Sequence, residues 1–213
     1  MARFARNLIR RRKGPAPLPG ARIVVGLGNP GQHYAHNRHN AGARATADLL
    51  NLLGLKLADK SKHAISGQGE TAHGPVVVAQ PRTYMNESGQ AVQSLLTIFE
   101  AQPESLILIV DELDIEVGKI RIRPDGGDAG QRGMRSIKGV LGSLDFPRVR
   151  IGVGRPYVGD VPSRDPDVVA EHLLSDPPRD EAAILRAAER RAAEAVVVIL
   201  RDGIEAAMNT YNG

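Results

Sequence analysis

The side chains best suited to chemistry fall into three short polar clusters. Because the chain has no cysteine, a histidine is the best candidate for activating a nucleophile, with an ordinary pKa of about 6.5. A buried carboxylate paired with it would fix its tautomer and stabilise the imidazolium that forms as it takes a proton from water. Asp111 ends the most apolar run of the chain and is the obvious partner. The clusters are Asn29 with Tyr34 and His39-Asn40, then Tyr84-Met85-Asn86, then Asp111-Glu112-Leu113-Asp114.

Taken by themselves, these residues indicate a hydrolase-like site and no more. Any one of the six histidines is more often a surface or core residue than a base. Asn29 and Asn86 could hold a substrate amide or ester without adding charge, but asparagine beside Gly and Pro is also common in turns. An aspartate after a strand often caps a helix. The elements that carry the clusters are therefore needed to interpret them.

An alternation of strands and helices carries these clusters. Strands mixed with crossover helices predict an α/β fold, with one twisted, mixed but largely parallel sheet flanked by helices. Open sheets of this kind place their sites beyond the carboxyl ends of the strands, which is where the clusters lie. The predicted strands are Arg22–Gly26, Pro75–Ala79, Leu106–Val110, Lys119–Arg123 and Arg148–Gly152, and the predicted helices are Ala41–Leu55, Ser88–Phe99, Gly133–Leu141 and Asp180–Asp202.

A glycine motif over residues 26–31 matches the dinucleotide fingerprint G-x-G-x-x-G directly after a strand. Its context argues against a nucleotide-binding oxidoreductase. The fingerprint should open a helix that receives the pyrophosphate, but Pro30-Gly31 is a turn signal and residues 32–40 have no helical apolar stripe. The acid expected about 20 residues later would be Asp48, which falls inside a predicted helix. We interpret the motif as a tight loop that presents Asn29.

The charge is divided unevenly along the chain. Residues 1–20 carry six basic side chains and no acid, and they end in a Gly/Pro-rich stretch typical of a linker. We therefore expect a basic, flexible arm (1–20) before one folded domain (21–213). The rest of the chain holds 22 basic and 24 acidic side chains, so the high pI belongs to the arm. The absence of cysteine fits a reducing cytoplasm, and no apolar run is long enough to span a membrane.

One segment of the domain is nevertheless strongly basic. From residue 119 to residue 150 there are eight basic and three acidic side chains. Arg132, Arg135 and Lys138 among them are spaced to lie along one helix face. This excess favours a phosphate-binding surface over an ordinary solvated face. Since aromatic residues make up only 3% of the chain, we expect recognition through phosphates and duplex shape rather than base stacking.

Four motifs follow one another in a characteristic order over roughly residues 22–205. They are Gly26–Gly31 with Tyr34 and Arg38–Gly42, then Pro81–Asn86 with Ser88-Gly89, then Asp111–Asp114, then Arg148–Gly154. In this order and spacing they resemble the motifs of bacterial-type peptidyl-tRNA hydrolases. The resemblance implies an esterase that cuts the bond between a peptide, or an N-blocked aminoacyl group, and the 3′-ribose of tRNA, and so recycles prematurely released peptidyl-tRNA. It implies a monomer without a cofactor, and no His/Asp/Glu set has convincing spacing for a metal.

The resemblance also assigns roles to residues of this chain. The family's catalytic base falls on His39, its orienting carboxylate on Asp111, and the asparagine that discriminates peptidyl from aminoacyl substrates on Asn29. Four further residues match positions that line the channel for the peptide and the 3′ end, and two match basic residues that grip the 5′-phosphate at the acceptor stem. The former are Tyr34, Tyr84, Met85 and Asn86, and the latter are Arg123 and Arg150.

One motif departs from the family pattern. Where the family often shows Gly-Gly-His-Asn-Gly-Leu, residues 129–134 read Ala-Gly-Gln-Arg-Gly-Met. Arg132 is always charged and only donates hydrogen bonds. It can stabilise an oxyanion or hold a 3′-terminal phosphate, but it cannot accept a hydrogen bond from water as asparagine does. We expect activity to be retained because His39 and Asp111 are both present. The alternative is a catalytically altered RNA-binding relative of the same fold.

Overall fold

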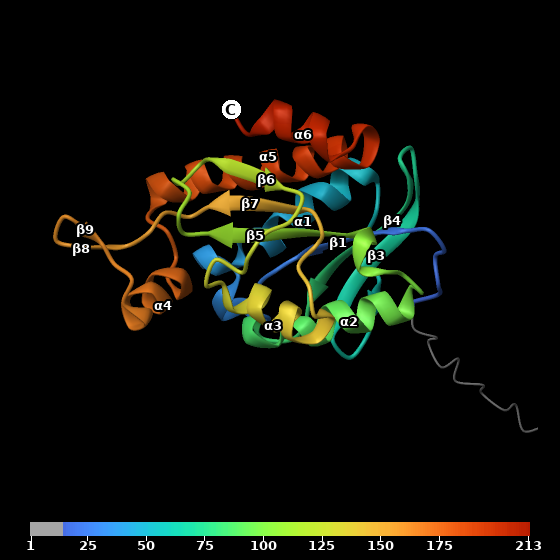
Figure 1. Cartoon of the computed structure of the whole chain (residues 1–213), viewed down its shortest axis with the longest axis horizontal. Coiled ribbons are helices and arrows are strands. Elements are labelled where there is room, and N and C mark those ends of the chain that lie inside the picture. The colour runs from blue at the N-terminus through green and yellow to red at the C-terminus, as the bar shows by residue number, and fades with distance from the viewer. Residues whose placement is uncertain (1–14) are drawn as a thin grey trace, which may run out of the picture.

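Seven strands form one mixed sheet with helices on both faces in the computed structural model, which describes residues 15–213 (Figure 1). The strand order is β2-β3-β4-β1-β5-β7-β6. Strands β4, β1, β5 and β7 run parallel, whereas β2, β3 and β6 are antiparallel to their neighbours. The sheet strands are β1 (Arg22–Gly26), β2 (Asp59–Lys60), β3 (Ala64–Thr71), β4 (Gly74–Pro81), β5 (Leu106–Glu112), β6 (Ile120–Arg123) and β7 (Arg148–Gly152).

The helices form two layers, one on each face of this sheet (Figure 1). Helices α1, α5 and α6 pack on one face, and α2 and α3 pack on the other. Helix α4 and the small hairpin β8–β9 lie beyond the carboxyl ends of β5 and β7. The bounds are α1 (Ala41–Leu53), α2 (Ser88–Ile98), α3 (Arg132–Leu141), α4 (Pro166–Leu174), α5 (Arg179–Asp202), α6 (Ile204–Tyr211), β8 (Tyr157–Val158) and β9 (Val161–Pro162).

The central strands are buried on both faces, which explains their nearly continuous apolar sequence. Along β1, Val24 faces the core under α1 and α5, while Ile23 and Val25 face the core under α2 and α3. All seven residues of β5 are buried, including Asp111 and Glu112 at its end. A strand that carries two acids into the interior must supply them with partners, and the partners of Asp111 help to build the site.

The α/β fold class and the largely parallel sheet are confirmed. The predicted bounds of β1 and β7 are exact. The helix predicted over residues 41–55 instead ends at Leu53, because Gly54 takes a left-handed φ of 68° and caps it. Strand β5 runs two residues further than predicted, so Asp111 lies within the strand rather than after it.

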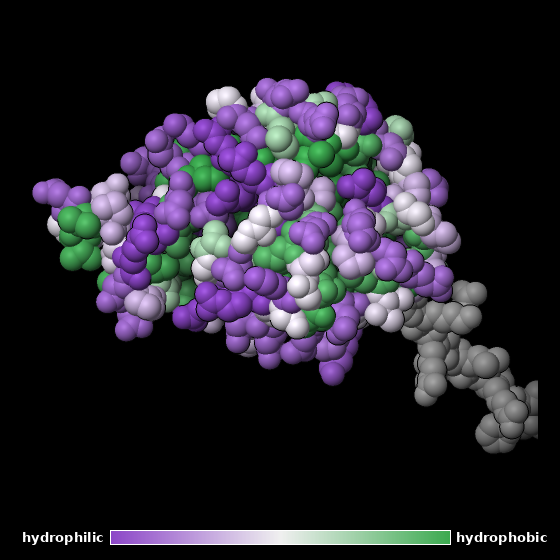
Figure 2. Space-filling model, viewed as in Figure 1, coloured by the Kyte–Doolittle hydropathy of each residue, from purple (hydrophilic) through white to green (hydrophobic). Residues whose placement is uncertain are grey.

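Several elements were not predicted from the sequence. Strand β3 was missed because its residues Ala64–Thr71 include two glycines and follow no clear alternation. Helices α4 and α6 are short, and the hairpin β8–β9 is exposed, with an apolar patch near its end that is visible on the surface (Figure 2).

Most of the predicted basic arm lies outside the described residues, since the description begins at residue 15. From Leu18 onward the chain packs against the core under α2. No helix in the described range is long and apolar enough to cross a membrane.

Candidate active site

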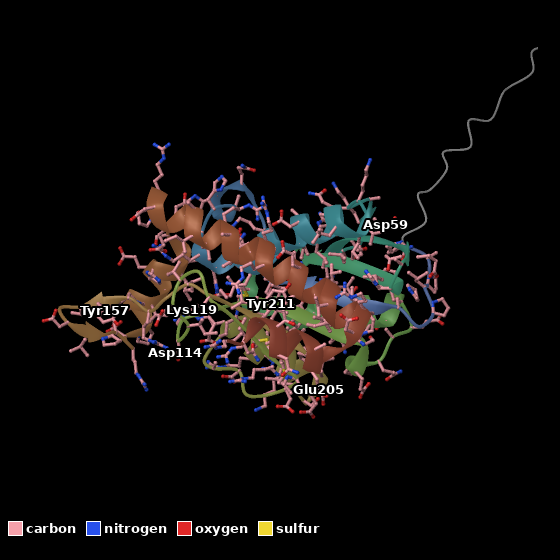
Figure 3. The ribbon with its side chains drawn as sticks, turned by 90° about the horizontal axis from the view of Figure 1, so that it is seen from above. Asp59, Asp114, Lys119, Tyr157, Glu205 and Tyr211 are labelled. Carbon is pink, nitrogen blue, oxygen red and sulfur yellow. The ribbon has the colours of Figure 1, made fainter. Side chains whose placement is uncertain are left out.

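The three polar clusters meet around one cavity of about 710 Å³ at the carboxyl ends of the parallel strands. The turn after β1, the turn before α2 and the end of β5 form its floor. The first turn of α3 forms one wall, and α4 with the segment before it forms another. The predicted site residues that line the cavity are Asn29, Tyr34, His39, Tyr84, Met85, Asn86, Asp111 and Arg132. Asp114 also lines the cavity, and it lies at the same end of the molecule as Tyr157 of the hairpin (Figure 3).

His39 and Asp111 form a buried pair in the floor of the cavity. His39 Nδ1 lies 2.8 Å from Asp111 Oδ2, and the two side chains are 8% and 2% exposed. Because an ionised carboxylate only accepts hydrogen bonds, Nδ1 carries the proton and Nε2 presents its lone pair. Nε2 accepts no hydrogen bond from residues 15–213 and the ring borders the cavity. The arrangement can therefore take a proton from a molecule in the cavity.

A second partner holds the other oxygen of Asp111. Gln131 Nε2 donates to Asp111 Oδ1 at 3.0 Å, so both carboxylate oxygens are engaged. The sequence identified Gln131 only as a departure from a motif. Its contact with Asp111 could not be found without the fold, because the two residues come from different elements.

Asn29 is fixed so that its amino group faces the cavity. Its Oδ1 accepts a hydrogen bond from Met85 N–H at 2.8 Å, which identifies the oxygen end of the amide. Its backbone is held by Asn40 at two points, with Asn29 N–H donating to Oδ1 and Asn40 Nδ2 donating to the Asn29 carbonyl, both at 2.9 Å. Within the described chain, Asn29 Nδ2 donates to no acceptor. It is therefore free to bind a carbonyl oxygen or an oxyanion.

The glycine motif serves packing. A Cβ on Gly42, at the start of α1, would lie 2.2 Å from the carbonyl oxygen of Ile109 in β5, and one on Gly26 would lie 2.2 Å from the carbonyl oxygen of Gly42. These glycines let the first turn of α1 lie directly on the ends of β1 and β5. That close approach carries His39, two residues before α1 begins, to Asp111. The interpretation of the motif as a loop presenting Asn29 agrees with this geometry.

Comparison with protein families matches residues 23–213 to peptidyl-tRNA hydrolase. The chain belongs to this family. It is 39% identical to the peptidyl-tRNA hydrolase of Caldanaerobacter subterraneus subsp. tengcongensis over 191 residues, which make up 90% of this chain and 99% of the relative. Identity to the peptidyl-tRNA hydrolase of Chloroflexus aurantiacus is 41% over 191 residues, covering 89% and 98% of the two chains.

The fold agrees with a solved member of the peptidyl-tRNA hydrolase family. The crystal structure of peptidyl-tRNA hydrolase from Acinetobacter baumannii superimposes with a TM-score of 0.80 at 35% identity, covering 89% of this chain and 93% of that one. The predicted resemblance is thus confirmed at the level of sequence and of fold.

The two arginines that the family resemblance assigns to the 5′-phosphate do not line the cavity. Arg123 is exposed near the end of the edge strand β6. Arg150, on β7, donates to the buried carboxylate of Glu112, with Nε 2.9 Å from Oε2 and a second bond from Nη2. Glu112 also accepts from the Asp114 backbone N–H at 3.1 Å. Arg150 therefore neutralises a buried acid in this structure, a role that the sequence did not reveal.

Other arginines surround the mouth of the cavity. Arg132 and Arg135 extend from the first turns of α3, and both are exposed. Arg155 and Arg164 flank the hairpin on the opposite side. Arg155 donates to Asp114 at 2.7 Å, and this hydrogen bond lowers the pKa of the Asp114 carboxyl. This chain has Arg132 where the peptidyl-tRNA hydrolase family pattern has an asparagine. It therefore has an additional positive charge at the mouth of the cavity.

A network next to His39 anchors α4 over the cavity. Arg38 is buried and donates to Glu181 at 2.7 Å and to Ser175 Oγ at 2.8 Å. His172, on α4, lies 3.0 Å from the carbonyl oxygen of Gly154, and burial lowers its pKa, with repulsion from Arg38 acting in the same direction. No group of three or more acidic or histidine side chains suited to a metal occurs among residues 15–213.

Proposed function

We propose that this protein hydrolyses the ester bond between the peptide and the 3′-ribose of peptidyl-tRNA. One observation carries the proposal: in a member of this family, His39 and Asp111 form a buried hydrogen-bonded pair that faces a cavity. A non-catalytic RNA-binding relative would have no need of such a pair. Keeping a carboxylate beside an imidazole in the interior costs desolvation energy, which activation of water justifies.

His39 acts as the general base. Its Nε2 takes a proton from a water molecule as the water oxygen attacks the ester carbonyl carbon. The imidazolium that forms donates from Nδ1 to Asp111, whose negative charge stabilises it. When the tetrahedral intermediate collapses, the bond to the ribose 3′-oxygen breaks and the proton passes to that oxygen. The products are a free peptide carboxylate and tRNA with a free 3′ end.

Asn29 and its neighbours bind the reacting group. The free Nδ2 of Asn29 donates to the carbonyl oxygen of the ester or of the last peptide bond, and the preorganised amide stabilises the developing oxyanion without moving. Arg132, one residue beyond Gln131 on the same rim, adds a positive charge toward the 3′-terminal phosphates. Tyr34, Tyr84, Met85 and Asn86 line the path of the peptide and the terminal nucleotide.

The tRNA body lies across the basic surface on α3 and β6. In this proposal the exposed Arg123 binds the 5′-phosphate, whereas Arg150 would have to leave Glu112 or share its guanidinium between the two anions. Such contacts are with phosphate and therefore do not depend on base identity. The monomeric state, the cytoplasmic location and the independence from metals and cofactors stay predictions from the sequence and the family.

The test is incubation of the full chain with N-acetyl-aminoacyl-tRNA, with and without EDTA. We expect release of the N-acetyl-amino acid at the same rate in both conditions, and none from unblocked aminoacyl-tRNA. Tight tRNA binding without release would instead support the RNA-binding alternative. Release that EDTA abolishes would contradict the expected independence from metals.

A further inference from the structure

Gln131 uses both ends of its side-chain amide, and each end holds a different part of the site. Nε2 donates to Asp111 Oδ1 at 3.0 Å and makes a weaker contact with Met85 Sδ at 3.5 Å, while Oε1 accepts from the backbone N–H of Met134 at 2.8 Å. The second bond makes Gln131 the N-cap of α3. A single side chain thus connects the start of α3 to the carboxylate that faces His39.

The loop before α3 fixes the position from which Gln131 reaches. Its backbone N–H donates to the carbonyl of Asp128 at 2.8 Å, and Asp128 Oδ1 accepts from Gly130 N–H, also at 2.8 Å. Ala129 and Gly130 have positive φ values of 49° and 77°, which turn the chain sharply into the helix. A left-handed alanine is costly and persists where its surroundings require it. The loop therefore aims the Gln131 side chain into the cavity floor.

Asp111 needs this second contact to serve His39. A carboxylate can rotate about its Cβ–Cγ bond, and a buried oxygen without a donor carries a desolvation penalty. Gln131 satisfies Oδ1 and thereby leaves Oδ2 to accept from His39 Nδ1 at 2.8 Å. Since an amide is neutral at all working pH values, it orients the carboxylate without competing with His39 for its negative charge.

We propose that Gln131 is a positioning residue for hydrolysis: it holds the Asp111 carboxylate toward His39 from the N-cap of α3. This inference rests on the proposed function and extends it to the position where the chain leaves the family pattern. Gln131 acts through Asp111, so its loss should lower kcat while leaving substrate binding almost unchanged.

Three substitutions separate positioning from helix capping. Gln131→Ser keeps a side-chain acceptor that can cap the Met134 N–H, but it is too short to reach Asp111 and adds no charge. Gln131→Met has a similar length and removes both bonds without adding charge. Gln131→His supplies a ring N–H donor and is the residue type that the family motif often has at this position. All three are assayed in the full chain with N-acetyl-aminoacyl-tRNA, and their Tm values are measured alongside.

We expect kcat to fall by roughly tenfold to a hundredfold in Gln131→Ser and Gln131→Met, as for loss of a hydrogen bond to a charged group. KM should stay within about twofold of the wild-type value, and Gln131→His should recover most of kcat. Only Gln131→Met should lose the helix cap, so Tm should fall in that variant while Gln131→Ser stays close to the wild type.

Two results would overturn the inference. One is a kcat close to the wild-type value in both Gln131→Ser and Gln131→Met. The other is a kcat that follows Tm across all three variants, because a purely structural role would give that correlation. Failure of the wild-type chain to hydrolyse the substrate would refute the proposed function instead, so the two failures are distinguishable.

Discussion

The side chain of Asn40 spans the backbone of Asn29 on both sides, accepting from its N–H and donating to its carbonyl, each at 2.9 Å. This places the loop after β1 against the residue that follows His39. Asn40, which follows the proposed base His39, therefore holds the backbone of Asn29, the proposed substrate-binding residue. A shift of Asn40 would change the distance between these two residues.

Replacing Asn40 should disturb the site without removing any reacting group. Asn40→Ala loses both hydrogen bonds, so Asn29 gains freedom and kcat/KM should fall by about tenfold, as expected for loss of one to two kcal/mol of positioning. Asn40→Asp keeps the acceptor and should lose less. Steady-state kinetics with N-acetyl-aminoacyl-tRNA measure both. Asn51→Ala, at an exposed position of α1, is the matched control. An equal loss of kcat/KM in that variant would show that the Asn40 effect is not specific to its contact with Asn29.

Removal of the base should separate chemistry from binding. In His39→Ala the carboxylate of Asp111 remains but no group takes the proton from water, so turnover should fall by at least about a thousandfold. The Kd for tRNA should change by less than about threefold, because His39 is nearly buried and makes no phosphate contact in the proposal. A single-turnover assay and a filter-binding assay give the two numbers. Wild-type-like turnover would remove His39 from its role.

The two arginines assigned to the 5′-phosphate should behave differently from one another. Arg123 is exposed, so Arg123→Ala should weaken tRNA binding and reduce the slope of log Kd against log salt by about one, with no change in Tm. Arg150→Ala leaves the Glu112 carboxylate buried without its partner and should cost about 2 kcal/mol of stability.

A double variant isolates the effect on Glu112. Glu112→Gln removes the buried charge, so in the Arg150→Ala background it should restore part of the lost stability, measured by urea unfolding. An Arg150→Ala variant as stable as the wild type would show that the ion pair is dispensable. An unchanged salt slope in Arg123→Ala would argue against the phosphate-binding surface.

The anchor of α4 should be sensitive to acid. Burial lowers the pKa of His172 below its ordinary value of 6.5. Between the lowered pKa of His172 in the folded chain and its ordinary pKa of 6.5 in the unfolded chain, the unfolded chain binds more protons than the folded one. The free energy of unfolding therefore rises with pH over this range. The contribution of His172 is thus complete above pH 6.5 and is lost as the pH falls below it. Urea midpoints measured from pH 7.5 to pH 5 should therefore decline less in His172→Gln than in the wild type.

His36 supplies the control for this titration. It is exposed, so His36→Gln should follow the wild-type curve. Parallel curves for the wild type and His172→Gln across the window would contradict the assignment.

Much of the fold follows from local patterns in the sequence. Strands β1 and β5 are almost uninterrupted apolar runs because both of their faces are covered, and their spacing from α1 and α2 is that of crossover units. Helix α4 was missed although Asp165 caps it and Pro166 opens it, a start signal that could have been used. The helix has only nine residues, and the feature that holds it, Arg38, acts from 134 residues away.

The site was less accessible from the sequence than the fold. His39 and Asp111 are 72 residues apart, and nothing in their neighbourhood distinguishes His39 from the other histidines without the family resemblance. The roles of Asn40, Gln131 and Glu112 depend on hydrogen bonds between elements that only the folded chain brings together. A side chain that positions another one cannot be recognised from the residues next to it in the sequence. Its role depends on which distant residue it contacts in the folded chain.

The close contact of α1 with β5 should tolerate no side chain at Gly42. Its Cβ would meet the backbone carbonyl of Ile109 at 2.2 Å, and a backbone atom in a central strand cannot move aside. Gly42→Ala should therefore lower the unfolding free energy by about 3 kcal/mol and displace His39 from Asp111, so that activity per folded molecule falls too. Gly139→Ala is the control: that helical glycine has nothing within 4 Å of an added Cβ, and the change should stabilise α3 by up to about 1 kcal/mol. Urea unfolding together with the hydrolysis assay tests both, and a Gly42→Ala protein with normal stability would mean that the packing role given to Gly42 is wrong.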